Sequence, residues 1–448
     1  MTPQKMLPIS IHNTADSMVA VWQGCPISYA LFLEHVQKIS QALPEQDFAV
    51  NLCEDRYLFL VSFMAVMLRK QTNLLPASKL PATVRETTND YKNCYIISDN
   101  ESLDADFFIN AHSLANTNNP DMIKEILVDA DQVAAVVFTS GTTGKPKPNI
   151  KTWGSLYNGA RLAIQRFNFC EKNIQAIVAT VPPQHMYGLE TSIVIPLLSG
   201  VATICTTTFY PADVEAALNE ITGKCVLVTT PIHLKAFVEA GLAYRNIDFV
   251  ISATSPMPLE VAAKAEKILK TEIFEIYGAS EFGSIASRHT INESVWTLYD
   301  EMALVSYENG VYIRGPQLKS ELPLHDRVVV NDAQHFELEG RNSDLIKIAG
   351  KRISLGELNQ KLAGIDGVLD GVFLVPQDQE GQPSQRLTAL VVAPGLDKQM
   401  IMDGLKKCID PVFLPRPLLL VDELPRNATG KIPHKEILSL YKSVCSSN

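Results

Sequence analysis

The sequence predicts an α/β protein with a large N-terminal domain of helix-covered, largely parallel sheets and a small C-terminal α+β lid domain. From about residue 133 to residue 278, short runs rich in Val, Ile and Thr alternate with helical segments, as in parallel sheets covered by helices. After about Gly310 this pattern changes, and the polar stretch Arg341–Asp344 separates two apolar segments. We therefore expect one domain over residues 1–340 and a second, mobile domain over residues 341–448.

The individual elements follow from local pattern. Short apolar runs predict strands over Ala134–Phe138, Gln175–Val181, Val201–Thr207, Cys225–Thr229, Phe249–Ala253 and Glu272–Tyr277. Helices are expected at Pro211–Ile221, which starts with Pro followed by acidic residues, and at Pro258–Lys270, which is dense in Ala, Leu, Glu and Lys. Further strands are expected at Val311–Arg314 and Arg327–Val330, and a hairpin at Val372–Val375 and Leu387–Val392.

Charge and composition exclude several classes of protein. The formal net charge is −10 without a long basic run, which argues against non-specific binding of nucleic acid. The eight cysteines are scattered, whereas zinc and redox motifs need close pairs. The N-terminus lacks the apolar core of a signal peptide, and apolar stretches such as Tyr57–Leu68 are too short to span a bilayer. These features predict a cytoplasmic protein without a membrane span.

A loop rich in Gly and hydroxyl groups follows the first of the predicted strands. Residues 139–147 read Thr-Ser-Gly-Thr-Thr-Gly-Lys-Pro-Lys. Glycines let backbone N–H groups approach a polyphosphate, hydroxyls donate hydrogen bonds, and ammonium groups offset negative charge. The glycine spacing differs from that of the Walker loop and of the Rossmann Gly-x-Gly-x-x-Gly loop. We expect contacts to a polyphosphate from Thr139, Ser140, Gly141, Thr142, Thr143, Gly144 and Lys147.

This loop resembles the signature of the acyl-adenylate-forming superfamily, which includes acyl-CoA synthetases, adenylation domains of peptide synthetases and firefly luciferase. A second segment, Tyr277-Gly278-Ala279-Ser280-Glu281, is similar to the family's Tyr-Gly-x-Thr-Glu. The resemblance implies that Tyr277 stacks on adenine beside Gly278. It also implies that the hydroxyl of Ser280 contacts the α-phosphate or the carboxylate, and that Glu281 holds the Mg²⁺ ion of Mg-ATP.

More motifs follow in the family's order. Gly310–Pro316 resembles the strand before the ribose site, and Asp326 stands where the family has the Asp that accepts both ribose hydroxyls. Residues Gly340–Ile353 resemble the hinge region. By this resemblance Arg341 reaches ribose or phosphate, and Ser343 is the pivot, at a position where the family usually has Asp or Lys.

The segment Leu424–Ile432 resembles the family's C-terminal signature, which ends in the catalytic lysine, here Lys431. A mobile ammonium that bridges the attacking carboxylate and the α-phosphate stabilises the transition state of adenylation. The matches together cover about residues 135–432. Nearer the N-terminus, Tyr29–Leu43 and Phe59–Pro76 resemble the family's N-terminal helices.

The class of acid is predicted from a third motif. Pro182–Gly188 resembles the Pro-x-x-His-x-x-Gly segment of acyl-CoA synthetases, in which His185 lies against the carboxylate and the thiol tunnel. Amino-acid-activating relatives have an Asp at the next position, but this chain has Met186. Because a buried ammonium without a carboxylate partner is costly, the substrate is expected to lack an α-amino group.

Four residues are expected to shape the acyl pocket. Tyr187, Ala253 and Ala279 are candidate walls. Ala253 and Thr254 stand where the family has a Gly-rich segment beside adenine and the acyl group, and their side chains favour a small aryl or acyl acid.

The predicted activity is ATP-dependent formation of acyl-AMP, followed by transfer to a pantetheine thiol of CoA or of a phosphopantetheinylated acyl carrier protein. The sequence leaves both acceptors open. Two other functions are compatible with the motifs: an adenylate-binding scaffold without turnover, and an adenylate-forming enzyme with a luciferase-like second step. The presence of Lys431, Glu281 and the phosphate loop disfavours the scaffold.

Overall fold

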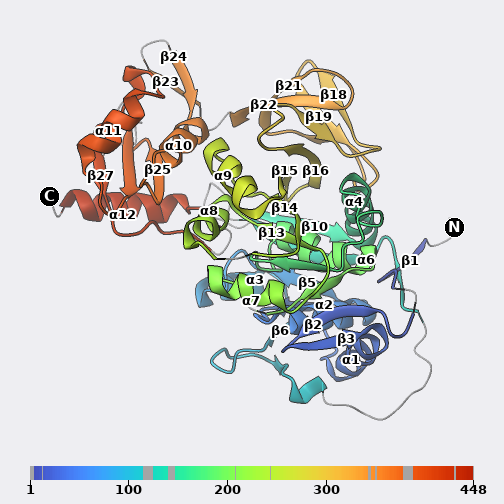
Figure 1. Ribbon diagram of the computed structural model, residues 1–448. Coiled ribbons are helices and arrows are strands. Elements are labelled where there is room, and N and C mark those ends of the chain that lie inside the picture. Colours follow the sequence, from blue (N-terminus) through green and yellow to red (C-terminus); the bar gives the residue numbers. More distant parts are fainter. Residues whose placement is uncertain are drawn as a thin grey trace.

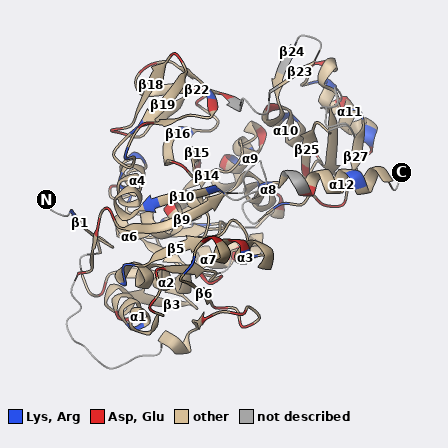
Figure 2. Cartoon of the chain, turned by 180° about the vertical axis from the view of Figure 1, so that it is seen from behind, with Lys and Arg blue, Asp and Glu red and all other residues tan. Residues whose placement is uncertain are grey.

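The protein has the α/β architecture expected from its sequence, with a large N-terminal part and a small C-terminal part (Figure 1). The computed structural model describes residues 5–12, 14–114, 125–139, 147–206, 208–242, 244–341, 345–348, 351–376, 387–427 and 430–446. Basic and acidic residues occur along both parts of the chain (Figure 2). None of the helices in these ranges is long and apolar enough to cross a membrane.

The first large sheet has six strands. Their order is β10 (Lys147–Thr152), β9 (Val133–Thr139), β5 (Thr72–Leu75), β4 (Phe48–Asn51), β6 (Cys94–Ser98) and β7 (Phe107–Phe108). All neighbours run parallel except β10 and β9, which form an antiparallel pair on either side of the predicted phosphate loop. The loop therefore connects the interior strand β9 to the edge strand β10.

The second large sheet has eleven strands, with a parallel centre. Their order is β21 (Asp326–Val330), β22 (His335–Arg341), β17 (Trp296–Leu298), β16 (Gly283–His289), β15 (Glu272–Ala279), β14 (Ile247–Ser252), β13 (Cys225–Thr229), β11 (Ala176–Ala179), β12 (Ala202–Ile204), β2 (Met18–Trp22) and β3 (Cys25–Ser28). Neighbours from β15 through β2 are parallel. The carboxyl ends of these strands therefore meet at one edge, where ligands bind in open α/β sheets.

Helices cover both faces of this sheet. They are α1 (Tyr29–Ala42), α2 (Arg56–Leu68), α4 (Trp153–Arg166), α5 (Met186–Leu189), the π-helical turn η2 (Glu190–Val194), α6 (Ile195–Ser199), α7 (Pro211–Asn219), α8 (Pro231–Ala240) and α9 (Leu259–Leu269). Helix α3 (Pro81–Asp90) instead packs on the six-stranded sheet, where Val84 joins a core with Val50 and Leu74. Strand residues alternate between two cores: Val226 and Val228 pack with the α2 and α4 side, and Leu227 with α7, α8 and α9. Successive residues of a strand point to opposite faces of the sheet, so each of the two helix layers packs against every second residue.

The C-terminal part has cores of its own. It comprises β23 (Leu345–Ile348), β24 (Lys351–Ser354), α10 (Leu355–Ala363), β25 (Asp370–Leu374), β26 (Thr388–Val392), α11 (Lys398–Lys406), β27 (Leu418–Leu420) and α12 (His434–Ser446). Every residue of its two apolar clusters comes from position 346 or later. Strands β25 and β26 pair antiparallel, as the predicted hairpin requires.

The remaining strands form two small sheets. One consists of β18 (Ala303–Tyr307), β19 (Gly310–Arg314) and β20 (Leu322–Pro323), and the other of β1 (Met6–Pro8) and β8 (Leu127–Asp129).

One element differs from the family pattern expected from the sequence. The helix expected over Phe59–Pro76 ends at Leu68 and gives way to strand β5. Lys70 has a φ of 59°, the left-handed conformation that stops a helix, and the chain then enters the parallel sheet. Asp55, whose carboxylate accepts the N–H groups of Tyr57 and Leu58, starts the helix.

Candidate active site

The predicted site residues gather at the carboxyl edge of the parallel strands. Thr139 ends β9, and His185 follows β11 through a short loop. Ala253 and Thr254 follow β14, and the Tyr277–Glu281 motif covers the end of β15 and the turn into β16. Strands far apart in the sequence therefore bring these residues to one place.

A tight turn between β15 and β16 presents Ser280 and Glu281. A Cβ atom at Gly278 would overlap the backbone of Gly283 and Ser284, so the close approach of the two strands requires glycine. Partial burial raises the pKa of Glu281, but its backbone N–H and Lys147 outweigh burial and lower it. The Nζ of Lys147 lies 3.2 Å from the carboxylate of Glu281, so two predicted ATP-site residues meet.

Two predicted nucleotide contacts are joined directly. The hydroxyl of Tyr277 donates to the carboxylate of Asp326 at 2.8 Å. The ring of Tyr277 is only 8% exposed and packs among Phe282, Trp296 and Phe336. This packing holds the ring of Tyr277 in place and leaves little of its surface exposed. The stacking of Tyr277 on adenine therefore stays a prediction.

The C-terminal loop approaches the N-terminal part next to His185. Burial, together with the positive charges of Lys431 and Lys79, lowers the pKa of His185 to about 4. Gly430 lies against α8, since a Cβ there would be 3.7 Å from Ile232. The exposed Lys431 is therefore close enough for its charge to act on a neutral His185.

The residues expected to shape the acyl pocket differ in their contacts, backbone conformation and burial. The hydroxyl of Tyr187 lies 2.9 Å from the carbonyl oxygen of Thr229 and 3.0 Å from that of Ile251, so it is engaged by the ends of β13 and β14. Thr254 has a φ of 82°, which is rare for a β-branched residue and marks a strained turn. Ala279 is half-buried at the end of β15.

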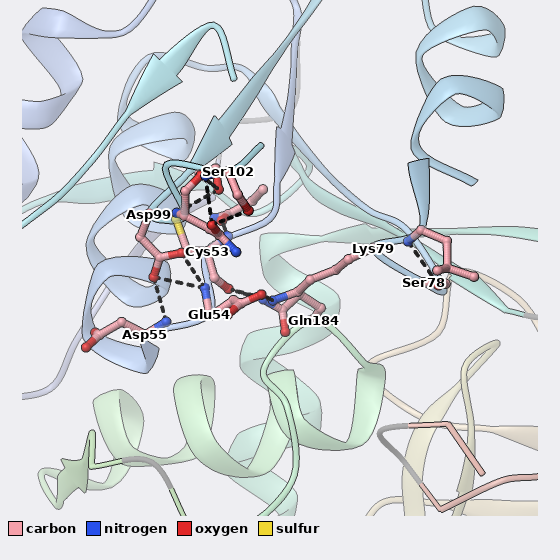
Figure 3. A network of polar contacts seen from close by, with 12 residues as sticks. Cys53, Glu54, Asp55, Ser78, Lys79, Asp99, Ser102 and Gln184 are labelled. Carbon is pink, nitrogen blue, oxygen red and sulfur yellow. Dashed lines mark hydrogen bonds and ion pairs between the residues drawn. The ribbon is translucent and has the colours of Figure 1, made fainter. Parts of the chain in front are cut away.

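A lysine that sequence reasoning missed, Lys79, also acts on His185 through its charge. The Nζ of Lys79 donates to the carbonyl oxygen of Cys53 at 3.4 Å and lies 3.7 Å from the carboxylate of Glu54 (Figure 3). The side-chain amide of Gln184, the neighbour of His185, donates to the same Cys53 carbonyl. Burial lowers the pKa of Lys79. No local pattern marks Lys79, because its surroundings come from the loops after β4 and β11.

A second pair that sequence reasoning missed lies beneath the β15–β16 turn. Lys151 on β10 is 5% exposed, and Glu190 at the start of η2 is 4% exposed. Burial lowers the pKa of Lys151 to about 8 and raises the pKa of Glu190. The sequence carried one signal for Glu190. It is the single charged residue in the run from Met186 to Leu198.

Several predicted residues lie outside the described part of the chain. They are Ser140, Gly141, Thr142, Thr143 and Gly144 of the phosphate loop, and Ser343 of the hinge. The backbone of Arg341 ends β22, opposite Asp326 on β21, while its side chain is not described.

The residues present fit a magnesium ion that binds mainly through ATP. Within the described ranges, no cluster of three or more His, Cys, Asp or Glu could hold a metal by itself. Mg²⁺ is typically held by one or two carboxylates together with substrate phosphates. The half-buried carboxylate of Glu281, beside the basic side chain of Lys147, suits this role.

The fold is a helix-covered α/β sheet with a separate C-terminal part, and the sequence motifs meet at the carboxyl edge of its strands. The family model of AMP-binding enzymes matches residues 10–325. The chain therefore belongs to the AMP-binding enzyme family, and the expected membership of the acyl-adenylate-forming superfamily is confirmed.

Curated relatives are acid–CoA ligases. The mitochondrial malonate–CoA ligase of Xenopus laevis is 21% identical over 401 residues, which span 72% of this chain and 69% of that protein. The 4-coumarate–CoA ligase of Rhodobacter capsulatus is 29% identical over 245 residues, which span 54% of this chain and 61% of that protein. The matches thus span about two thirds of the relatives' lengths. One relative is mitochondrial, and the expected cytoplasmic location stays a prediction.

Solved structures share the fold over nearly the whole chain. The o-succinylbenzoate coenzyme A synthetase from Bacillus subtilis in complex with AMP superimposes with a TM-score of 0.80 at 16% identity, covering 97% of this chain and 98% of that one. A benzoate CoA ligase from Burkholderia xenovorans gives a TM-score of 0.75 at 17% identity, covering 94% of this chain and 96% of that one. These similarities establish the two-part fold.

Proposed function

We propose that the protein is an AMP-forming ligase that activates a small carboxylic acid without an α-amino group and passes the acyl group to a pantetheine thiol. The observation that carries this proposal is the approach of Lys431, from the C-terminal loop, to His185 at the carboxyl edge of the main sheet. An adenylating enzyme needs a mobile cation at the place where a carboxylate meets the α-phosphate. Family membership supports the same reading.

In the first half-reaction, each residue has a separate task. Lys431 offsets the charge that develops as the carboxylate attacks, and Ser280 donates a hydrogen bond to the reacting oxygens. Tyr277 and Asp326 hold the nucleoside, with Arg341 nearby, while Thr139 to Gly144 and Lys147 hold the phosphates. Glu281 would hold Mg²⁺, which offsets the charge of the triphosphate when bound.

The residues expected to line the acyl pocket support an acid without an α-amino group. Met186 is buried where an ammonium-binding relative would need a carboxylate. The hydroxyl of Tyr187 donates to backbone carbonyls of Thr229 and Ile251, so its side chain joins α5 to the ends of β13 and β14. Relatives named for malonate and 4-coumarate act on acids without an α-amino group, in agreement with this choice.

The relatives and the two-part fold support CoA as the acceptor of the acyl group. The relatives named above are CoA ligases, which favours free CoA over a carrier protein. We propose that residues 341–448 form a mobile domain that pivots at Ser343, withdrawing Lys431 so that a thiol reaches the acyl-AMP beside His185. A neutral His185 accepts a proton from the thiol more readily than a charged one would.

Pyrophosphate release tests the proposal. We would incubate the protein with Mg-ATP and malonate, 4-coumarate or benzoate, using glycine as the amino-acid control, in the presence of CoA, holo acyl carrier protein or neither. The expected result is release that depends on an acid without an α-amino group, with thioester formed on CoA. ATP binding without acid-dependent release would favour the scaffold, and release without thioester on either acceptor would favour a different second step.

A further inference from the structure

We propose that Lys151 and Glu190 form a buried pair that holds the turn carrying Ser280 and Glu281, and so position the carboxylate of Glu281 for Mg-ATP. The inference rests on the proposed function. Neither residue touches the nucleotide in this scheme, so both are positioning residues for the adenylation step.

Lys151 holds the turn at its first end. Its Nζ donates to the backbone carbonyl oxygen of Glu281 at 2.8 Å. Lys147 lies four residues earlier on the same strand, and therefore on the same face, and its Nζ contacts the carboxylate of Glu281 at 3.2 Å. Strand β10 thus fixes the backbone of Glu281 with a buried lysine and meets its side chain with an exposed one.

Glu190 holds the turn at its other end. Its carboxylate accepts the backbone N–H of Ser284 at 3.1 Å and also accepts the hydroxyl of Ser284. Gly283, with a φ of 77°, leads into this contact, and a Cβ there would lie 3.6 Å from the carboxylate of Glu190. The segment from Glu281 to Ser284 is therefore anchored at both ends by side chains from β10 and η2.

The neighbouring charges explain why the ammonium of Lys151 is tolerated in the buried position beneath the turn. A buried charge is costly without a partner, and the negative charges of Glu190 and Glu281 both stabilise the ammonium of Lys151. Removing one of two mutually stabilising buried charges typically lowers stability, because the other charge loses its compensation. A purely structural role would therefore lower stability and leave the metal site unchanged, whereas a positioning role would also change the metal site.

Magnesium dependence distinguishes the two roles. We would compare Lys151→Met and Glu190→Gln, each close in volume to the native side chain, with the wild type in acid-dependent ATP–pyrophosphate exchange over a range of Mg²⁺ concentrations. Loss of an outer contact that orients a metal ligand typically weakens metal binding about 10-fold or more. We expect a rise of that size in the Mg²⁺ concentration for half-maximal exchange and in the KM for ATP, with less than about a twofold change in the KM for the acid.

Arg288→Met is the matched control. Arg288 forms an ion pair at 2.6 Å with Glu275, which is 3% exposed, and the two residues face each other farther along the same two strands. This variant should lower Tm without changing the Mg²⁺ dependence. Should Lys151→Met fail to fold, the nearly isosteric Glu190→Gln carries the same test.

Two negative results have different meanings. A fall in Tm with unchanged Mg²⁺ dependence in both variants, as in the control, would overturn the inference and leave the pair with a structural role. Absence of acid-dependent exchange in the wild type would instead overturn the proposed function. In that case calorimetric titration with ATP, with and without Mg²⁺, still tests the pair: Mg²⁺ should strengthen ATP binding to the wild type more than to Lys151→Met, and equal strengthening would overturn the inference.

Discussion

Lys431 and His185 are 246 positions apart in the chain, yet the charge of one acts on the other. If Lys431 acts on the transition state, Lys431→Ala should reduce pyrophosphate exchange by about 100-fold or more while ATP affinity changes little. Exchange and equilibrium ATP binding should be measured on the same preparation. Lys442→Ala, which removes an exposed lysine from α12, is the control. Exchange near the wild-type rate in Lys431→Ala would remove the residue from the mechanism.

The pKa of His185 predicts how stability depends on pH. The pKa is lowered from the usual 6.5 to about 4, so between these values the unfolded chain binds a proton that the folded protein does not. Stability therefore rises with pH across this window and is lost as the pH falls through it, by about 3 kcal/mol for this residue. We expect the free energy of unfolding of His185→Asn, measured with urea, to fall less from pH 6.5 to pH 4 than that of the wild type.

A surface histidine provides the comparison for this measurement. His112 is exposed, so His112→Asn should retain the wild-type fall in stability. If His185→Asn shows the same fall as His112→Asn, the low pKa of His185 is wrong. The neutral state expected for the thiol step would then lose its support.

At the scale of the element, the β15–β16 hairpin depends on glycine at position 278. In Gly278→Ala the new methyl group would overlap the backbone of Gly283 and Ser284, so the strands must separate. We expect a loss of about 1–3 kcal/mol in the free energy of unfolding, as for other overpacked sites, together with weaker Mg-ATP use because the turn carries Glu281. Urea unfolding and the KM for ATP measure the two effects.

A glycine in an open position tests whether this effect is specific. Gly356 lies in α10, where a Cβ would have only the hydroxyl of Ser354 near it, at 3.9 Å. Gly356→Ala should be neutral or stabilising, since alanine favours the helix. Equal stability of both variants would show that the hairpin can relax around a methyl group.

At the scale of the whole molecule, contacts from α8 and from the segment just before α9 hold the C-terminal part in its present pose. The Nζ of Lys235 donates to the carbonyl oxygens of Ala363, at 3.3 Å, and of Val368, just beyond the end of α10. Gln360 donates to the carbonyl oxygen of Met257 at 3.1 Å. These bonds join the two parts while Lys431 is near His185.

Removing the lysine should shift the balance between poses. Hydrogen bonds to a charged group contribute about 1.5–3 kcal/mol, so Lys235→Met should change the population of this pose by roughly tenfold or more. We expect a larger radius of gyration in small-angle scattering and slower acyl-AMP formation, with transfer from preformed acyl-AMP retained. Lys224→Met, which removes a lysine paired with Asp248 inside the N-terminal part, is the control. Equal loss of both half-reactions would contradict a role in the pose.

The sequence by itself determined the class of fold and the family. Strand β13 has the predicted bounds of Cys225–Thr229, and β9 and β14 differ from their predictions by at most two residues at either end. Short apolar strands and amphipathic helices are local patterns, and local patterns can be read from neighbouring residues. The motifs around Thr139 and Tyr277 were likewise readable, because each lies within a few consecutive positions.

Only the tertiary structure decided which side chains support the site. Lys79 beside His185, and Lys151 and Glu190 beneath the β15–β16 turn, contact segments about 90 to 130 positions away. The end of helix α2 at Leu68 was also decided by the sheet that the chain enters next. The physical reason is that burial and charge partners depend on how parallel strands align their carboxyl ends, and this alignment leaves no periodic signal in the sequence.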